Sequence, residues 1–237
     1  MNTPSLSLIY LCLNEQQALA RTLDEALAFC ESALGDWEIL VVDDGSTDQS
    51  ADIVRAYAAR EPRVRLLQHA RNLGMGAGLK TGIAASQKDY FCMLAADGQI
   101  PAAELAKMLP LLTHAPIVLS TYGNRPNNAV RTLISRSFRL FMRAAVGIDF
   151  ALEGTYLFPV AVARDRIGLQ VIGSNTFFFS FELLIRAKRL GFATADSVIA
   201  SRPRLDGNGS RVANLKQIKM VANEVMKLRA RLAAEHP

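Results

Sequence analysis

The sequence predicts one α/β domain built on a mostly parallel β-sheet with helices on both faces. Short apolar runs rich in β-branched residues alternate with amphipathic stretches of helical length, and a polar cluster directly follows several of these runs. The chain has 237 residues, 50% of them hydrophobic and 21% charged, which is enough to bury one sizeable core. We expect a single domain over 1–237, with a regular half at 1–121 and a less regular half at 122–237.

The regular half alternates strand and helix. Each apolar run predicts a strand, and the residues that follow it predict where a helix begins. Asn14 is expected to cap the first helix and Ser46 or Thr47 the second, whereas glycines at 74–78 and then Pro101 open the next two. The expected strands are 6–11, 37–42, 64–68, 90–94 and 117–120, and the expected helices end near residues 34, 60, 87 and 112.

The second half has a weaker pattern that ends in a C-terminal helix. A polar stretch at 122–128 leads into a basic helix, and a loop rich in Gly, Arg and Asp precedes the last helix. The expected order is helix 129–146, strand 156–162, helix 179–190, strand 193–200, loop 201–211 and a helix to 232. No repeat or linker interrupts the chain, which agrees with one domain.

Composition limits the setting in which the protein works. Three scattered cysteines without metal spacing argue against a disulfide framework and favour a reducing compartment. The N-terminus reads as a strand and not as a secretory signal, and no apolar run reaches the roughly 18–20 residues that cross a bilayer. The expected location is the cytoplasm, with peripheral contact to the inner face of the membrane as an option for a chain of net charge +5.

Acidic turns follow two of the predicted strands directly. Asp43 and Asp44 come after one strand, and Asp97-Gly98-Gln99 comes after another. Carboxylates in such places are costly unless they meet donors or a cation, so they suit ribose hydroxyls, a base N–H or a metal. The alternative is a plain turn in which Asp and Ser cap a helix. Because ligands bind outside the carboxyl ends of parallel strands, these turns predict a ligand site.

The glycines at 74–78 invite two motif assignments that do not fit. They resemble a dinucleotide-binding fingerprint, but they follow the third strand and no acidic residue completes the unit. Lys80-Thr81 resembles the end of a phosphate-binding loop, but no glycine precedes the lysine. We interpret this segment as a helix start that needs close backbone packing, with direct phosphate contact as the alternative.

Together these motifs resemble the family 2 glycosyltransferases. The motifs that occur in the order and spacing of that family are 8–15, Asp43 to Asp48, Asn72-Leu73-Gly74 with Gly76, and Asp97-Gly98-Gln99. Within the family the chain is most similar to polyprenyl-phosphate sugar transferases of the dolichyl-phosphate mannosyltransferase type, over nearly its whole length. The resemblance implies a Rossmann-like GT-A fold, in which 1–121 binds a nucleotide and 122–237 faces an acceptor.

The resemblance also implies roles for individual residues. Those implied to bind the nucleotide of a nucleotide-sugar donor are Glu15, Asp43, Asp44 and Asp97. Asp97 and Gln99 are implied to hold Mg²⁺ or Mn²⁺, and Asp97 and Arg131 to be catalytic. Those implied to bind a polyprenyl-phosphate acceptor are Arg125, Arg131, Ser135, Arg204, Ser210 and Arg211.

Three departures from the family pattern bear on activity. Ala95 replaces an aspartate that helps fix ribose and metal, Leu11 replaces a proline, and Gly154-Thr155-Tyr156 replaces a Gly-Phe-Arg segment. Because of the first departure, an alternative interpretation is a catalytically impaired relative that binds a nucleotide without transferring sugar. The other two leave the substrates open, including a family 2 transferase with a different acceptor.

The predicted function is inverting transfer of a sugar to a polyprenyl phosphate at the cytoplasmic membrane surface. A phosphate monoester has a second pKa of about 6, so its oxygen is already anionic near pH 7 and needs no dedicated base. Arginines that align this oxygen with the anomeric carbon are then sufficient. A sugar hydroxyl would instead want a carboxylate, for which Glu153 and Glu182 are the candidates. The basic helix at 129–146 either rests on the membrane or packs in the core.

Two other classes are disfavoured. A nucleotidyltransferase would want a Gly-rich triphosphate loop after the first strand, which 11–15 does not offer. A nucleic-acid partner is not expected, because the positive charge is not interleaved with aromatic residues.

Overall fold

The computed structural model describes residues 4–124, 137, 140–148, 150–205 and 215–235. Within these residues, seven strands form one sheet in the order β3-β2-β1-β4-β6-β5-β7. The strands are β1 (Leu6–Cys12), β2 (Trp37–Asp43), β3 (Val64–Gln68), β4 (Tyr90–Ala95), β5 (Ile117–Tyr122), β6 (Tyr156–Pro159) and β7 (Thr194–Ile199). The longer helices are α1 (Gln16–Ala33), α2 (Ser50–Arg60), α3 (Met75–Ala85), α5 (Phe178–Arg189) and α6 (Leu215–Glu235).

The sheet is mostly parallel, as the sequence predicts. β1 pairs in parallel with β2 and β4, β2 with β3, and β5 with β7. Only β6, among the described strands, runs antiparallel to its neighbours, β4 and β5. The helices α1, α2 and α3 supply the crossovers that parallel neighbours require.

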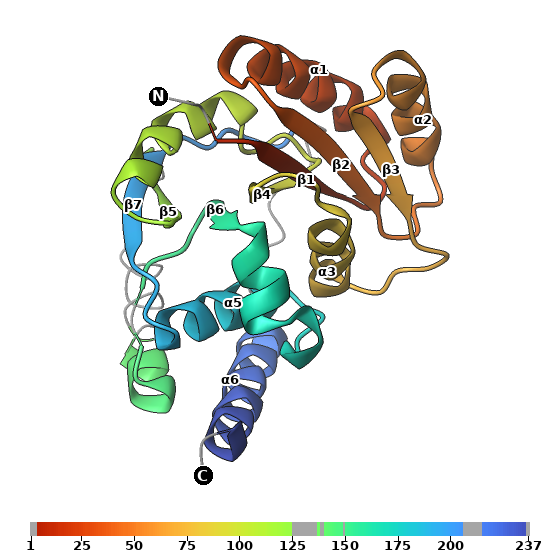
Figure 1. The fold of residues 1–237 in the computed structure, drawn as a ribbon. Coiled ribbons are helices and arrows are strands. Elements are labelled where there is room, and N and C mark those ends of the chain that lie inside the picture. Colours follow the sequence, from red (N-terminus) through yellow and green to blue (C-terminus); the bar gives the residue numbers. More distant parts are fainter. Residues whose placement is uncertain (1–3, 125–136, 138–139, 149, 206–214, 236–237) are drawn as a thin grey trace.

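Helices cover both faces of the sheet, so its strands are buried on both sides. Leu8 and Tyr10 of β1 face a core shared with α1 and α2, whereas Ile9 faces a core shared with α3 and α5. Figure 1 shows α1 and α2 above the strands and α3 below them. This explains the uninterrupted apolar character of the run, because each fully buried aliphatic side chain contributes about 1.5–3 kcal/mol on either face.

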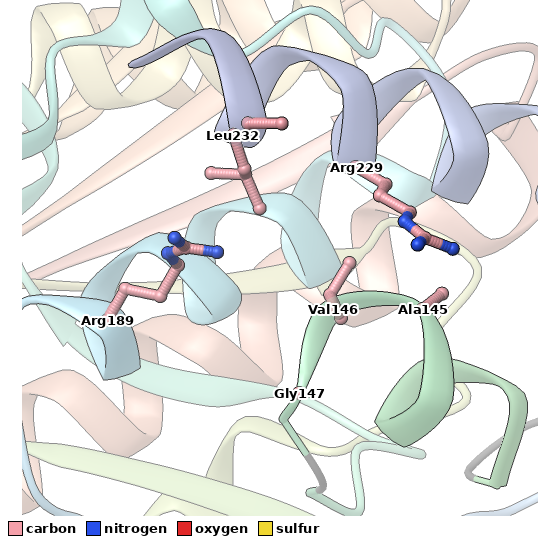
Figure 2. Close-up of a pocket in the computed structure, with 7 residues that line it drawn as sticks. Ala145, Val146, Gly147, Arg189, Arg229 and Leu232 are labelled. Atoms are coloured by element: carbon pink, nitrogen blue, oxygen red, sulfur yellow. The ribbon is translucent and has the colours of Figure 1, made fainter. Parts of the chain in front are cut away.

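A third core lies away from the sheet, between three helical segments. Residues 140–146 are helical and pack with α5 and α6 around a set of apolar side chains. This set comprises Met142, Val146, Phe178, Ile185, Val225, Leu228 and Leu232. A cavity of about 300 Å³ opens between these helices, with Arg189 and Arg229 on its wall (Figure 2). None of its lining residues belongs to the acidic turns of the sheet.

Some predicted helix starts are wrong because polar side chains serve a neighbouring loop. Asn14 has a positive φ of 56°, and Glu15 is the residue before α1, without a side-chain capping bond. The Asn14 Oδ1 atom instead accepts from the Thr47 N–H at 2.8 Å, and Ser46 Oγ accepts from the Asn14 N–H at 2.9 Å. These hydrogen bonds join the loop after β1 to the loop after β2. The Asn14 and Ser46 side chains do not cap the helices, and α2 begins only at Ser50.

Two further elements differ from the expectation. The helix expected over 101–112 is two 3₁₀ segments, η1 (Ala102–Lys107) and η2 (Leu109–Thr113). Pro110 stands at the start of the second segment, where its ring and missing N–H stop an α-helix from passing through. The strand expected at 156–162 ends at Pro159, and η3 (Val162–Ile167) and η4 (Leu169–Val171) follow. No helix in the described ranges has both the length and the apolar character that crossing a bilayer demands.

Candidate functional site

The acidic turns meet at one edge of the sheet, as the sequence predicts. Together with Glu15, which follows β1, they lie after β1, β2 and β4, which are neighbours in the order β2-β1-β4. The register aligns Cys12 with Asp43 and Leu11 with Ala95, so the three strands end at the same level. The strand ends therefore place Glu15, the adjacent pair Asp43 and Asp44, and Asp97 at the same end of the sheet, although these three positions are far apart in the sequence.

A single arginine side chain joins two of these acids. Arg204 donates from Nη2 to both oxygens of Glu15, at 2.6 and 2.8 Å, and from Nη1 to Asp97 Oδ2 at 3.1 Å. The side chains of Arg204, Glu15 and Asp97 are 18%, 12% and 8% exposed, so water has little access to this cluster. Charge-assisted, bidentate contacts of this kind are stronger than exposed ion pairs. The resemblance implies that Arg204 binds the acceptor. In the structure, Arg204 contacts Glu15 and Asp97, which the resemblance implies to bind the donor.

Asp43 and Asp44 bind protein donors and order the loops around them. Asp43 is fully buried and accepts from the Ser46 N–H at 2.9 Å and from the Gln68 amide at 3.0 Å. Asp44 accepts from the backbone N–H groups of Leu73 and Gly74, at 2.9 and 2.8 Å. These bonds give both carboxylates hydrogen-bond donors within the protein, and their implied role in binding a nucleotide stays a prediction.

Sequence reasoning missed two polar residues at this edge. Gln68 is aligned with Asp43 at the end of β3, and its position at a strand end was the signal that could have found it. His69 Nδ1 lies 2.7 Å from Asp44 Oδ1, and its Nε2 lies 2.9 Å from Thr81 Oγ1. These contacts fix the loop between β3 and α3 against the acidic turn.

The glycines that open α3 pack directly against another backbone segment. A Cβ atom on Gly76 would lie 2.7 Å from the Asn175 carbonyl carbon, and one on Gly74 would lie 2.5 Å from the Asn175 oxygen. The Gly76 N–H donates to that same oxygen at 2.8 Å. The interpretation of this segment as a helix start that needs close backbone packing is therefore confirmed.

We expect Gly76→Ala to lower the free energy of unfolding by about 1–3 kcal/mol, because an added methyl would collide with backbone that cannot rotate away. This outweighs the gain of roughly 1 kcal/mol in helix propensity. Urea unfolding would measure the change. Gly35→Ala is the matched control, since nothing lies within 4 Å of its added Cβ, and equal stability of the two variants would contradict the packing role.

Glu182 does not serve as a catalytic base. It is fully buried in α5, where Oε1 accepts from Arg186 Nε at 3.2 Å and Oε2 accepts from Arg231 Nη2 of α6 at 2.8 Å. With no access to solvent and both oxygens engaged, the side chain cannot take a proton from a substrate. Its role is to join α6 to α5, and Glu153, the other candidate, is exposed.

Most of the implied acceptor-binding residues cannot be placed. Arg125, Arg131, Ser135, Ser210 and Arg211 lie outside the described residues. Their roles stay predictions.

The implied metal site depends on one carboxylate. Among the described residues, no group of three His, Cys, Asp or Glu side chains could hold an ion by itself. Asp97 Oδ1 accepts from the Gln99 N–H at 3.0 Å, and Ala95 supplies no side-chain oxygen. A hard divalent ion that keeps water and phosphate oxygens in its shell fits such a sparse donor set, provided that the ligand brings those phosphates.

Comparisons with known proteins agree with the motifs. The sequence pattern of the family described as "Glycosyl transferase family 2" matches residues 7–180. A dolichyl-phosphate beta-glucosyltransferase, ALG5C of Trichomonas vaginalis, is 36% identical over 100 residues, covering 40% of this chain and 30% of the relative. The undecaprenyl-phosphate 4-deoxy-4-formamido-L-arabinose transferase of Pectobacterium carotovorum is 28% identical over 156 residues, covering 65% of this chain and 47% of the relative. The chain thus spans less than half the length of either relative.

A solved structure shows the same fold. Glucosyl-3-phosphoglycerate synthase from Mycobacterium tuberculosis, in complex with Mn²⁺, uridine diphosphate and glucosyl-3-phosphoglycerate, superposes with a TM-score of 0.66 at 19% identity. The match covers 96% of this chain and 80% of that one. The predicted GT-A fold is therefore confirmed.

Proposed function

Because this chain belongs to glycosyl transferase family 2, we propose that it moves a sugar from a nucleotide-sugar donor to a polyprenyl phosphate, with inversion at the anomeric carbon. The observation that carries the proposal is the cluster of Glu15, Arg204 and Asp97 at the ends of adjacent parallel strands. The names of the two relatives, both transferases acting on polyprenyl phosphates, support the acceptor class.

In this proposal the donor lies across the acidic edge of the sheet. Glu15 contacts the nucleoside, whereas the fully buried Asp43 and its neighbour Asp44 order the loops behind it. Asp97 and Gln99 would hold Mg²⁺ or Mn²⁺ together with diphosphate oxygens, which would neutralise charge on the leaving group. Arg204 already lies beside Asp97 and can grip a phosphate oxygen in the same planar fork that now holds the carboxylates.

The reaction needs no proton acceptor. An oxygen of the acceptor phosphate attacks the anomeric carbon, the bond from that carbon to the diphosphate oxygen breaks, and the nucleoside diphosphate leaves with the electron pair. The acceptor oxygen is anionic near neutral pH, so the protein's work is alignment and charge neutralisation. We assign acceptor alignment to Arg125, Arg131 and Ser135, with Arg131 catalytic, and to Ser210 and Arg211 of the late loop.

We place the reaction at the cytoplasmic face of a membrane, because the acceptor is a lipid. In the described part of the basic helix, one face packs against the protein, and only the opposite face could contact a membrane. Met142 and Val146 pack into the helical core, whereas Leu140 is 70% exposed and Arg143 is exposed beside it. An outward pairing of leucine and arginine suits a membrane interface.

The experiment that tests the function has a binding arm and a transfer arm. Nucleoside diphosphates are screened by thermal shift with and without Mn²⁺, and one base is expected to stand out, since ligand at 100 times its Kd stabilises by about 2.7 kcal/mol. The matching nucleotide sugar is then incubated with a short-chain polyprenyl phosphate. The expected product is a polyprenyl-phosphate sugar of inverted anomeric configuration.

Ala95 motivates a second candidate, a relative that binds nucleotide without transferring sugar. It predicts a clear thermal shift and no product with any acceptor, and turnover by the unmodified protein would exclude it. If no nucleoside diphosphate shifts the melting temperature, both candidates fail.

A further inference from the structure

The segment after β7, residues 200–205, forms a strap over the turn that carries Asp97. The backbone N–H of Arg202 donates to the backbone carbonyl oxygen of Gln99 at 2.9 Å, and the backbone N–H of Leu205 donates to the backbone carbonyl oxygen of Asp97 at 3.1 Å. Gly98, at a φ of +70°, leaves room for the Leu205 side chain, which an added Cβ would meet at 2.5 Å. The strap and the turn therefore fit together as one unit.

The Arg202 side chain ties the strap to α1. Its guanidinium donates to both oxygens of Glu25, at 3.1 and 2.5 Å, and its Nε donates to the Gly98 oxygen at 2.7 Å. The side chains of Arg202 and Glu25 are 26% and 32% exposed, so water screens the pair only in part. The Arg202 guanidinium lowers the pKa of the Glu25 carboxyl, so the pair stays ionised at neutral pH.

These contacts bracket Arg204. The backbone is bonded at Arg202 on one side and at Leu205 on the other, so the main chain at Arg204 has little freedom. That restraint sets where the Arg204 guanidinium reaches, beside Glu15 and Asp97.

We propose that Arg202 and Glu25 are positioning residues that hold Arg204 at the diphosphate of the donor. The inference rests on the proposed function, because it takes the ligand to be a nucleoside diphosphate. On donor binding the strap stays anchored and only the Arg204 side chain moves, from the carboxylates to the phosphate oxygens. Anchoring beforehand spares the ordering cost that a free loop would meet on binding.

The test compares Arg202→Gln and Glu25→Gln with Arg21→Gln. Arg21 is the matched control, because its Nε donates to the same Glu25 at 3.0 Å but it belongs to α1 and not to the strap. We expect the first two variants to weaken binding of the selected nucleoside diphosphate about tenfold, the scale seen when an orienting partner is lost, and the control to bind normally. Arg202→Lys, which keeps a positively charged donor beside Glu25, should recover part of the affinity that Arg202→Gln loses.

Amide hydrogen exchange measures, without any ligand, how firmly the Arg202–Glu25 pair anchors the strap. The Arg202 and Leu205 amides should lose protection in the two anchor variants and keep it in Arg21→Gln. Unchanged protection would overturn the proposal, and so would a wild-type affinity in Arg202→Gln or an Arg202→Lys variant that binds no more tightly than Arg202→Gln. Failure of the proposed function would look different, since the wild type itself would bind no nucleoside diphosphate while the exchange result still decided the anchor.

Discussion

Replacing Asp97 by Asn is expected to lower the rate of sugar transfer about a thousandfold, the largest loss of activity that we predict for a single substitution. The change keeps the shape of the side chain and removes the charge that meets Arg204 and, in the proposed mechanism, the divalent ion. The fold should persist, because Glu15 still binds the Arg204 guanidinium through both oxygens. Initial rates with the selected nucleotide sugar and a polyprenyl phosphate would measure the effect.

Asp48→Asn is the matched control for this prediction. Asp48 belongs to the neighbouring acidic run, where its oxygens accept from the backbone N–H groups of Gln16 and Ser50 at 3.1 and 2.9 Å. Asparagine keeps one acceptor oxygen there, so transfer should stay within about twofold of the wild type. An Asp97→Asn enzyme as active as this control would show that Asp97 has no part in the chemistry.

Glu182→Gln is expected to cause the largest loss of stability, about 3–5 kcal/mol. The substitution removes a fully buried carboxylate from two ion pairs. It leaves Arg186, whose side chain is 8% exposed, with Glu235 as its remaining counter-charge, and it breaks the link to Arg231 of α6, whose side chain is 35% exposed. For a chain of this size each kcal/mol corresponds to roughly 2–4 °C, so the melting temperature should fall by about 6–20 °C. Calorimetry or a circular dichroism melt would record the shift.

The same substitution at an exposed carboxylate provides the comparison. Glu153→Gln should change the free energy of unfolding by less than about 0.5 kcal/mol, as is usual for surface positions. Similar melting temperatures for the two variants would mean that the ion pairs between α5 and α6 do not hold the C-terminal helix in place.

The regular half of the fold was predictable because its signals are local. β3 has the predicted bounds, and β1, β2 and β4 each extend one residue beyond the expectation. A strand buried on both faces must be apolar throughout, and a parallel neighbour demands a crossover helix, so both features are written in consecutive residues. The edge that gathers the acidic turns follows from the same reasoning.

The helix starts at Asn14 and at Ser46 or Thr47 were not predictable in the same way. A cap is a local choice, but here the side chains of one loop bond the backbone of the other, across two strands. Propensity describes what a side chain does for its own helix, so it misses a partner supplied by a distant loop.

The sequence by itself determined the parallel sheet, its apolar strands and the acidic edge, since each depends on the spacing of neighbouring residues. Only the tertiary structure decided that Arg204 lies between Glu15 and Asp97, and that Glu182 is buried where no substrate reaches it. Those contacts form when the chain returns from far along the sequence. Their geometry is fixed by how the later elements pack on the sheet, and no local pattern contains that information.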